Sequence, residues 1–109
     1  MSQTIVDTWS DSEQAIARSA FEKAYDRAVA QLVASVQARA ASLADVDSLW
    51  RLHDFLSSER HTMEGRFAFR LDGILFVFAS LVKEQLLQLH ELDGLAADKL
   101  AKVAAMSRF

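Results

Sequence analysis

The sequence predicts an elongated all-α protein of about four helices, and three features carry this prediction. The 109 residues include three glycines and no proline, whereas a sandwich or barrel needs turn-forming residues at many hairpins. Apolar side chains recur every three or four residues along most of the chain, which is the spacing of one helix face. Hydrophobic residues make up 51% of the chain, which is enough to form a core. We therefore expect a single all-helical domain over residues 1–109, with long first helices as a stem and shorter C-terminal helices as a head.

Composition and charge also exclude several classes of function. Because the chain has no cysteine, it has no disulfide scaffold, thiolate zinc site, iron–sulfur cluster or cysteine nucleophile. The formal net charge of −3 argues against a nucleic-acid-binding module. The first residues, MSQTIVDTWSDSEQ, lack the basic and apolar regions of a signal peptide. The most apolar stretch, residues 73–82, is about half as long as a membrane-spanning helix, so we expect a cytoplasmic protein without membrane insertion.

The first helix is expected to begin after Ser10, because Ser10 and Glu13 have the spacing of a capping box. Trp9 is expected to pack against the start of this helix. An apolar stripe then continues without a helix breaker to about residue 43. A helix of roughly 30 residues is about 45 Å long, whereas a compact domain of this size has a radius of gyration of about 13 Å. Such a helix needs another long helix to lie against.

A second helix is expected to run from an aspartate cap, Asp45 or Asp47, to about Gly65, which is well placed to end it. One narrow face of this helix is apolar and is expected to be buried; it consists of Leu49, Leu52, Leu56 and Met63. Helices of such unequal length make a poor self-sufficient monomer. We therefore expect a homodimer in which long helices of two chains bury each other's apolar stripes, with two-fold symmetry as the commonest arrangement.

A third helix is expected over about residues 67–89, with Gly73 inside it. Residues 74–78 are apolar around the whole helix, so we expect this segment to be buried on every side. Phe76 and Phe78 are accordingly expected in the core. The alternative is that one aromatic side chain stays at the surface for a partner, and Phe76 is the candidate.

A short last helix is expected after Asp93, which is placed to cap it. Its expected inner face consists of Leu95, Leu100, Val103 and Met106. Lys99 and Lys102 are expected to be solvated charges on this helix. Electrostatic contact at the rim of an interface is the alternative role for these two lysines.

A second face of the helix that ends near Gly65 combines a tryptophan with polar side chains. It comprises Trp50, His53, Asp54, Ser57 and His61, with Arg60 at its border. A serine nucleophile is disfavoured because no glycine-rich turn or helix N-terminus supplies an oxyanion hole. Zinc is disfavoured because histidines eight residues apart are separated by about 12 Å along a helix, and the paired motif of a di-iron bundle is missing. We expect no catalytic residue, metal or cofactor.

Two interpretations of this face stay open. In the first, its residues join two chains of the dimer: Asp54 accepts a hydrogen bond from the Trp50 indole, and Arg60 reaches the partner chain. In the second, the face docks another protein, because tryptophan and arginine are frequent interface hot spots. The interpretations are compatible, since a surface near a two-fold axis can serve both purposes.

The segment LWRLHDFLSSERHTMEGRF, residues 49–67, resembles the fluorescence recovery protein family of cyanobacteria. The resemblance extends to FEKAY at residues 21–25, ILFVFA at residues 74–79 and LAADK at residues 95–99, and it covers nearly the whole chain. Its most specific motif is Trp50-x-x-His53-Asp54 followed by Arg60.

This resemblance implies an all-helical homodimer that binds the photoactivated, red form of the orange carotenoid protein, mainly through that partner's C-terminal domain. It implies that the protein accelerates the return to the orange form and promotes detachment from the phycobilisome. Non-photochemical quenching then ends and antenna fluorescence recovers. The protein would be no enzyme and would lie at thylakoid membranes only peripherally, through the phycobilisome.

The resemblance also assigns residues to these roles. The implied functional patch is Trp50, His53, Asp54 and Arg60, and Phe76 and Lys102 match positions of partner contact. Leu49 matches the dimer interface, which we expect to comprise Leu49, Trp50, Leu52, Asp54, Leu56 and Arg60. An alternative function is a regulatory helical dimer of the same family that has a different client and no role in photoprotection.

Overall fold

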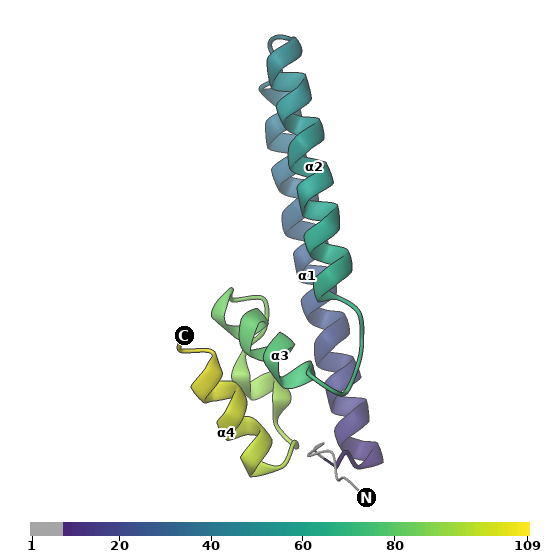
Figure 1. Cartoon of the computed structure of the whole chain (residues 1–109), viewed down its shortest axis with the longest axis vertical. Helices are drawn as coiled ribbons and strands as arrows, with labels where there is room; N and C mark the ends of the chain where they lie inside the picture. The colour runs from purple at the N-terminus through teal and green to yellow at the C-terminus, as the bar shows by residue number, and fades with distance from the viewer. Residues whose placement is uncertain (1–7) are drawn as a thin grey trace, which may run out of the picture. The chain divides into compact units, whose positions relative to one another are not determined.

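The computed structural model of the chain describes residues 8–109, and its regular structure is helical (Figure 1). Four α-helices and one 3-10 turn follow one another: α1 (Asp11–Ala41), α2 (Val46–Arg66), α3 (Ile74–Lys83), η1 (Leu89–Leu92) and α4 (Ala97–Met106). Residues 8–109 contain no β-strand, only one isolated bridge. The predicted all-α class with about four helices is therefore confirmed.

The described residues divide into two compact units. The hairpin unit is Tyr25–Ala68, which holds the later part of α1 and all of α2. The terminal unit combines the residues up to Ala24 with Phe69–Phe109, so it holds the start of α1 together with α3, η1 and α4. The single domain expected from the sequence stays a prediction.

The first helix begins where the sequence predicts. The backbone N–H of Glu13 donates to Ser10 Oγ, and the backbone N–H of Ser10 donates to Glu13 Oε1, both at 3.1 Å. These two bonds complete the capping box. The helix then continues to Ala41, close to its predicted end.

The core of the terminal unit combines small residues of α1 with large residues of the later segments. On α1, the buried apolar residues of this unit are Ala17, Ala20, Phe21 and Ala24. The largest fully buried side chains are Ile74, Phe78, Leu81, Leu87, Leu92 and Val103. In the loop before α3, Phe69 packs edge-on against Phe21 with ring centroids 5.1 Å apart, and the Arg18 guanidinium lies 4.2 Å from the Phe69 centroid. These contacts fix the loop on α1.

A buried ion pair joins the start of α1 to the start of α4. Lys99 Nζ lies 3.0 Å from both carboxylate oxygens of Glu13, and the Lys99 side chain is only 3% exposed. The same ammonium donates to the Thr8 carbonyl and lies 4.3 Å from the centre of the Trp9 ring. The prediction that Lys99 is solvated is therefore wrong, because a carboxylate, a carbonyl and an aromatic ring replace its water.

This network lowers the pKa of Glu13 to about 2 from an ordinary value of 4.5, first through the backbone N–H of Ala96 at 2.8 Å, then through Ser10 and Lys99. A carboxyl group with a lower pKa in the folded state stabilises the fold above pH 4.5, and this contribution disappears as the pH falls to about 2. We expect the difference in unfolding free energy between wild type and Glu13→Gln to shrink over that interval. Urea unfolding of both proteins from about pH 7 to about pH 2.5 measures it, and an unchanged difference would contradict the assignment.

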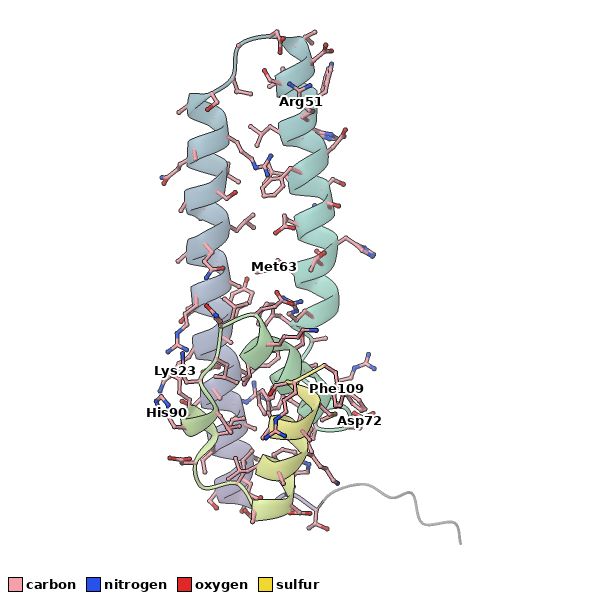
Figure 2. The ribbon with its side chains drawn as sticks, turned by 90° about the vertical axis from the view of Figure 1, so that its left-hand side faces the viewer. Lys23, Arg51, Met63, Asp72, His90 and Phe109 are labelled. Atoms are coloured by element: carbon pink, nitrogen blue, oxygen red, sulfur yellow. The ribbon has the colours of Figure 1, made fainter. Side chains whose placement is uncertain are left out.

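The hairpin unit consists of two antiparallel helical segments, residues 25–41 of α1 and the whole of α2 (Figures 1 and 2). Asp45 caps α2: its Oδ1 accepts from the Ser48 N–H at 2.8 Å, and Ser48 Oγ accepts from the Asp45 N–H at 3.1 Å. The guanidinium of Arg39 lies 3.7 Å from the centre of the Phe55 ring. This cation–π contact links the two helices of the unit.

The hairpin unit has almost no core of its own. Within Tyr25–Ala68, a range that the structure describes completely, Ala28 alone is buried. None of the 21 residues of α2, which is described along its whole length, is buried. An amphipathic helix normally gains its stability by burying its apolar face. This unit therefore lacks most of that stabilisation within one chain.

The second helix ends at Arg66, one residue from the predicted end near Gly65, but Gly65 does not terminate it. α2 continues through Gly65 to Arg66, and the N–H of Phe67 donates to the Met63 carbonyl at 2.9 Å. A Cβ built on Gly65 would meet no atom within 4 Å. Gly65 is thus an ordinary helical residue, and its backbone does not adopt the left-handed conformation that glycine allows.

The prediction that the third helix begins near residue 67 is wrong, because α3 starts at Ile74. Phe67 packs edge-on against Tyr25, and Phe69 packs edge-on against Phe21. Two residues that are two positions apart thus contact the same helix, which is the period of extended chain rather than of a helix. The aromatic residues that suggested an early helix start are therefore anchors of a loop.

Both ends of α3 lie at residues with left-handed backbone. Gly73, expected inside the helix, has φ 81° and is its N-terminal cap, a conformation that glycine adopts without steric cost. At the other end, Gln85 has φ 65° and the N–H of Leu86 donates to the Leu81 carbonyl at 2.9 Å. This left-handed closure ends the helix at Lys83, about six residues before the predicted end.

The last helix begins at Ala97 with Ala96 as its cap, so the prediction that Asp93 caps it is wrong. The chain first forms η1 and then turns at Gly94, which has φ 105°. A Cβ at Gly94 would clash with the Cδ1 methyl of Ile16. The turn therefore needs glycine for its backbone angle, and a side chain there would also have to displace the end of the Ile16 side chain on α1.

Gly94→Ala is expected to lower the free energy of unfolding by about 1–3 kcal/mol, because the alanine backbone is strained at this φ and its methyl displaces Ile16. Gly65→Ala is the matched control. Its open helical position predicts a gain of about 0.5–1 kcal/mol instead. Urea unfolding followed by circular dichroism measures both changes, and opposite signs are the expected result. A Gly94→Ala variant as stable as wild type would show that the turn tolerates a side chain.

Candidate functional site

The face of α2 that combines tryptophan with polar side chains is exposed. Trp50 is 58% exposed, and its ring meets the His53 ring edge-on with centroids 6.2 Å apart. His53 Nδ1 lies 3.3 Å from Asp54 Oδ1. Among the described contacts, Asp54 therefore pairs with His53 and not with the Trp50 indole as expected. The imidazole links the indole and the carboxylate into one connected group on the surface of α2.

Arg60 lies further along α2 and pairs with its own helix. Its Nε donates to Glu64 Oε2 at 3.2 Å, and both side chains are largely exposed. An exposed pair of this spacing contributes only about 0.3–0.5 kcal/mol, so Arg60 can leave Glu64 for a stronger partner at little cost. The interpretation that Arg60 serves another molecule is thus compatible with this contact.

The apolar side of the hairpin unit is uncovered within one chain. Leu49 is 46% exposed and Leu56 is also exposed, while Leu52 and Met63 are half-buried. The exposed large apolar side chains of this unit are Tyr25, Val33, Leu43, Val46, Leu49, Trp50 and Leu56. Large apolar side chains left exposed in such number are typical of an interaction site. The predicted dimer stripe is therefore available for contact.

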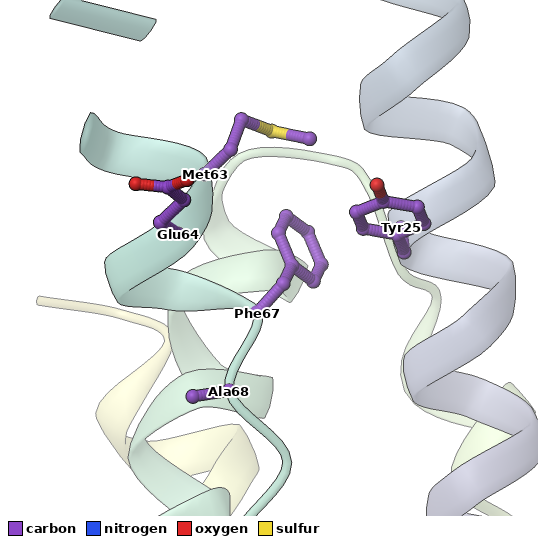
Figure 3. A pocket seen from close by; sticks show the side chains of 5 residues that line it. All are labelled: Tyr25, Met63, Glu64, Phe67 and Ala68. Atoms are coloured by element: carbon purple, nitrogen blue, oxygen red, sulfur yellow. The ribbon is translucent and has the colours of Figure 1, made fainter. Parts of the chain in front are cut away.

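A cavity of about 330 Å³ lies at the C-terminal end of α2, lined by Tyr25, Met63, Glu64, Phe67 and Ala68 (Figure 3). The rings of Tyr25 and Phe67 meet edge-on with centroids 5.2 Å apart, and the Glu64 carboxylate points away from them. Sequence reasoning missed this cavity because it placed Phe67 inside a helix. Its lining is mainly apolar and brings together no nucleophile and base.

The remaining predicted site residues lie in the terminal unit. Phe76 on α3 is 71% exposed, whereas Phe78, two positions later, is fully buried. The expectation that residues 74–78 are buried on every side is therefore wrong, and the alternative of a surface aromatic at Phe76 is confirmed. Lys102 is exposed on α4, and α3 and α4 pack against each other. Phe76 and Lys102 thus occupy neighbouring helices.

Of the alternative catalytic and metal groups weighed from the sequence, the structure brings together only His53 and Asp54. Among the described residues, Ser57 and His61 share no hydrogen bond, and no cluster of three or more His, Asp or Glu side chains could hold a metal ion. Within residues 8–109, no helix is both long enough and apolar enough to cross a bilayer.

Comparison with known proteins gives concordant matches. A family model described as "Photoprotection regulator fluorescence recovery protein" matches residues 9–107. The "Fluorescence recovery protein" of Synechocystis sp. (strain ATCC 27184 / PCC 6803 / Kazusa) is 47% identical over 108 residues, which are 99% of each chain. The solved fluorescence recovery protein of Fremyella diplosiphon is 42% identical with a TM-score of 0.90, and that of Synechocystis sp PCC 6803 is 47% identical with a TM-score of 0.89. Both superpositions cover 94% of this chain and 100% of the solved chain.

Proposed function

The chain belongs to the fluorescence recovery protein family, and from this premise we propose that it binds the photoactivated, red form of the orange carotenoid protein and accelerates its return to the orange form. The return detaches the carotenoid protein from the phycobilisome, ends quenching and restores antenna fluorescence. The matched family model is described as a photoprotection regulator. Accelerating the return of the carotenoid protein to its orange form would regulate photoprotection by ending quenching. The protein acts in the cytoplasm and reaches thylakoid membranes only through the phycobilisome.

The observation that carries the proposal is the exposed group of Trp50, His53 and Asp54 on α2, in a chain of this family. A large aromatic ring with polar neighbours is the composition of a protein interface hot spot. Arg60 adds a cation whose intramolecular pair is weak. Phe76 and Lys102 add a second exposed contact on the terminal unit, which we assign to the partner's C-terminal domain.

We propose further that the working form is a homodimer joined through the hairpin unit. Leu49, Leu52 and Leu56 form its apolar contact, and Trp50, Asp54 and Arg60 lie at its edge, where they can also reach the carotenoid protein. The support is the near absence of a core in the hairpin unit. A second copy supplies the missing apolar surface most economically, because the same face is then buried on both chains.

The action requires neither a cofactor nor covalent chemistry on this chain. A bound protein shifts a conformational equilibrium only by its differential affinity for the two forms. It accelerates the conversion only if it binds the arrangement at the top of the barrier more tightly than the red form. A hundredfold acceleration corresponds to about 2.7 kcal/mol of such preference, which a few interface contacts can supply.

The proposal is tested by mixing the protein with light-adapted orange carotenoid protein and following the decay of the red absorbance in the dark. With one dimer equivalent, we expect the decay to accelerate by about tenfold or more. Asp54→Asn is expected to lose most of this effect. Asp11→Asn, an exposed aspartate in the first turn of α1, is the matched control and is expected to retain it.

An unchanged decay with the wild-type protein at stoichiometric dimer would overturn the proposal. It would favour a regulatory dimer of the same family with a different client. If Asp54→Asn and Asp11→Asn lost the same share of the acceleration, the activity of the wild-type protein would still stand. The assignment of Asp54 to the contact surface would then be wrong.

A further inference from the structure

The orientation of α4 depends on an ion pair as well as on apolar packing. Along its ten residues, all of which are described, only Lys99 and Val103 are buried. Leu100 and Met106, expected on its inner face, are half-buried. Apolar contact is non-directional, so one fully buried valine and its half-buried neighbours constrain the rotation of the helix about its own axis less sharply than a directional bond does.

Glu13 supplies the direction that apolar packing lacks. Its Oε2 accepts from the backbone N–H of Ala96 at 2.8 Å, and both of its oxygens lie 3.0 Å from Lys99 Nζ. Ala96 is the N-terminal cap of α4 and has no side-chain cap of its own. The carboxylate of Glu13 therefore serves as a cap from α1, at the helix end where a negative charge is favourable.

These bonds define one rotation of α4. Charge-assisted hydrogen bonds are short and directional. Here one carboxylate binds the backbone N–H of the cap residue Ala96 and the side chain of Lys99, three positions later. Turning α4 about its axis would withdraw the Lys99 ammonium from Glu13. The pair thus restricts the rotation of α4. Its net contribution to the free energy of unfolding does not measure this effect, because buried ion pairs add little net stability.

We propose that Glu13 and Lys99 are positioning residues for partner docking: they set the rotation of α4 and thereby the direction in which Lys102 faces. The inference rests on the proposed function, which places Lys102 at the carotenoid protein. Lys102 lies three positions after Lys99, about 60° around the helix, yet Lys99 is buried and Lys102 is exposed. A rotation that brings Lys99 towards solvent would therefore redirect Lys102.

The first measurement needs no partner. Because the chain has no cysteine, Lys102→Cys accepts a single nitroxide label, whose mobility in the electron paramagnetic resonance spectrum reports the setting of α4. Adding Lys99→Met removes the ammonium while keeping a long apolar side chain. We expect a larger mobile component in the spectrum, together with retained helicity in circular dichroism. An unchanged spectrum would overturn the proposal.

The second measurement uses dark relaxation of the carotenoid protein with Lys102 intact. Lys99→Met is expected to raise the protein concentration needed for half-maximal acceleration by about tenfold, with little change in the maximal rate. In a Lys102→Glu background the same substitution is expected to have a much smaller effect, because Lys102 no longer contributes. Purely additive losses would show a general structural role and overturn the positioning role.

Lys23→Met is the matched control, since Lys23 projects from α1 into solvent (Figure 2). It is expected to alter neither the spectrum nor the acceleration. If Lys99→Met fails to fold, Glu13→Gln replaces it, because the amide oxygen still accepts from Ala96 while the charge is lost. A wild-type protein that fails to accelerate relaxation contradicts the proposed function alone, since the nitroxide measurement still decides the rotation of α4.

Discussion

Leu49→Glu is expected to leave the protein monomeric at micromolar concentration. Leu49 lies on the exposed apolar face of α2, and in the homodimer that we propose the substitution places an unpaired carboxylate at the contact of each chain. Leaving such a group desolvated costs about 2 kcal/mol or more. Each chain of the two-fold dimer carries the substitution, so the dimer bears this cost twice. The dissociation constant is therefore expected to rise by roughly a thousandfold. Sedimentation velocity of wild type and variant measures the change.

Ser58→Glu is the matched control because Ser58 lies on the polar side of the same helix and is exposed. It adds the same charge and is expected to keep the dimer. Retention of the dimer by Leu49→Glu would place the contact on another surface of the chain. Dissociation by both variants would indicate a general effect of negative charge on α2.

Phe78→Ala and Phe76→Ala are expected to separate stability from docking. Phe78 is fully buried in the terminal unit, so its removal leaves a cavity and is expected to cost about 3–5 kcal/mol. Phe76 is 71% exposed on the same helix, and its truncation is expected to change stability by less than about 0.5 kcal/mol. Because Phe76 is proposed to contact the carotenoid protein, its loss should instead weaken that contact.

Urea unfolding and the dark-relaxation assay measure the two effects separately. Phe76→Ala is expected to unfold like wild type and to require about tenfold more protein for the same acceleration. A Phe76→Ala variant with full activity would remove Phe76 from the docking surface. A Phe78→Ala variant as stable as wild type would show that the terminal unit tolerates a cavity at this position.

The two long helices were predictable because strong local signals agree along them. The capping box at Ser10 and the cap at Asp45 mark their starts, and an apolar spacing of three to four residues runs between. The later boundaries were not predictable in the same way. Phe67 and Phe69 anchor a loop, and Leu86, Leu87 and Leu92 are buried outside any α-helix. Apolar residues buried in irregular segments imitate a helical pattern, so the third helix was predicted far too long.

The candidate site shows the same division. The exposed face of Trp50, His53 and Asp54 follows from helical geometry alone, and the structure places these residues together. The burial of Lys99 had no local signal, because its partner Glu13 is 86 positions away in sequence. The surface position of Phe76 needed knowledge of which side of α3 faces the core. Long-range contacts decide both, and periodicity describes only one helix at a time.

If the homodimer that we propose forms, the exposed hairpin unit makes the folded fraction of the protein depend on its concentration. In the homodimer that we propose, two helices with one buried residue, Ala28, gain their stabilising surface from the second copy, so association and folding become linked equilibria. Thermal stability would then rise with the logarithm of protein concentration. A cell that lowers the copy number of this protein would also lower the fraction of it that is folded. A change in copy number would therefore change the amount of active protein in two ways, through the number of chains and through the fraction of them that is folded.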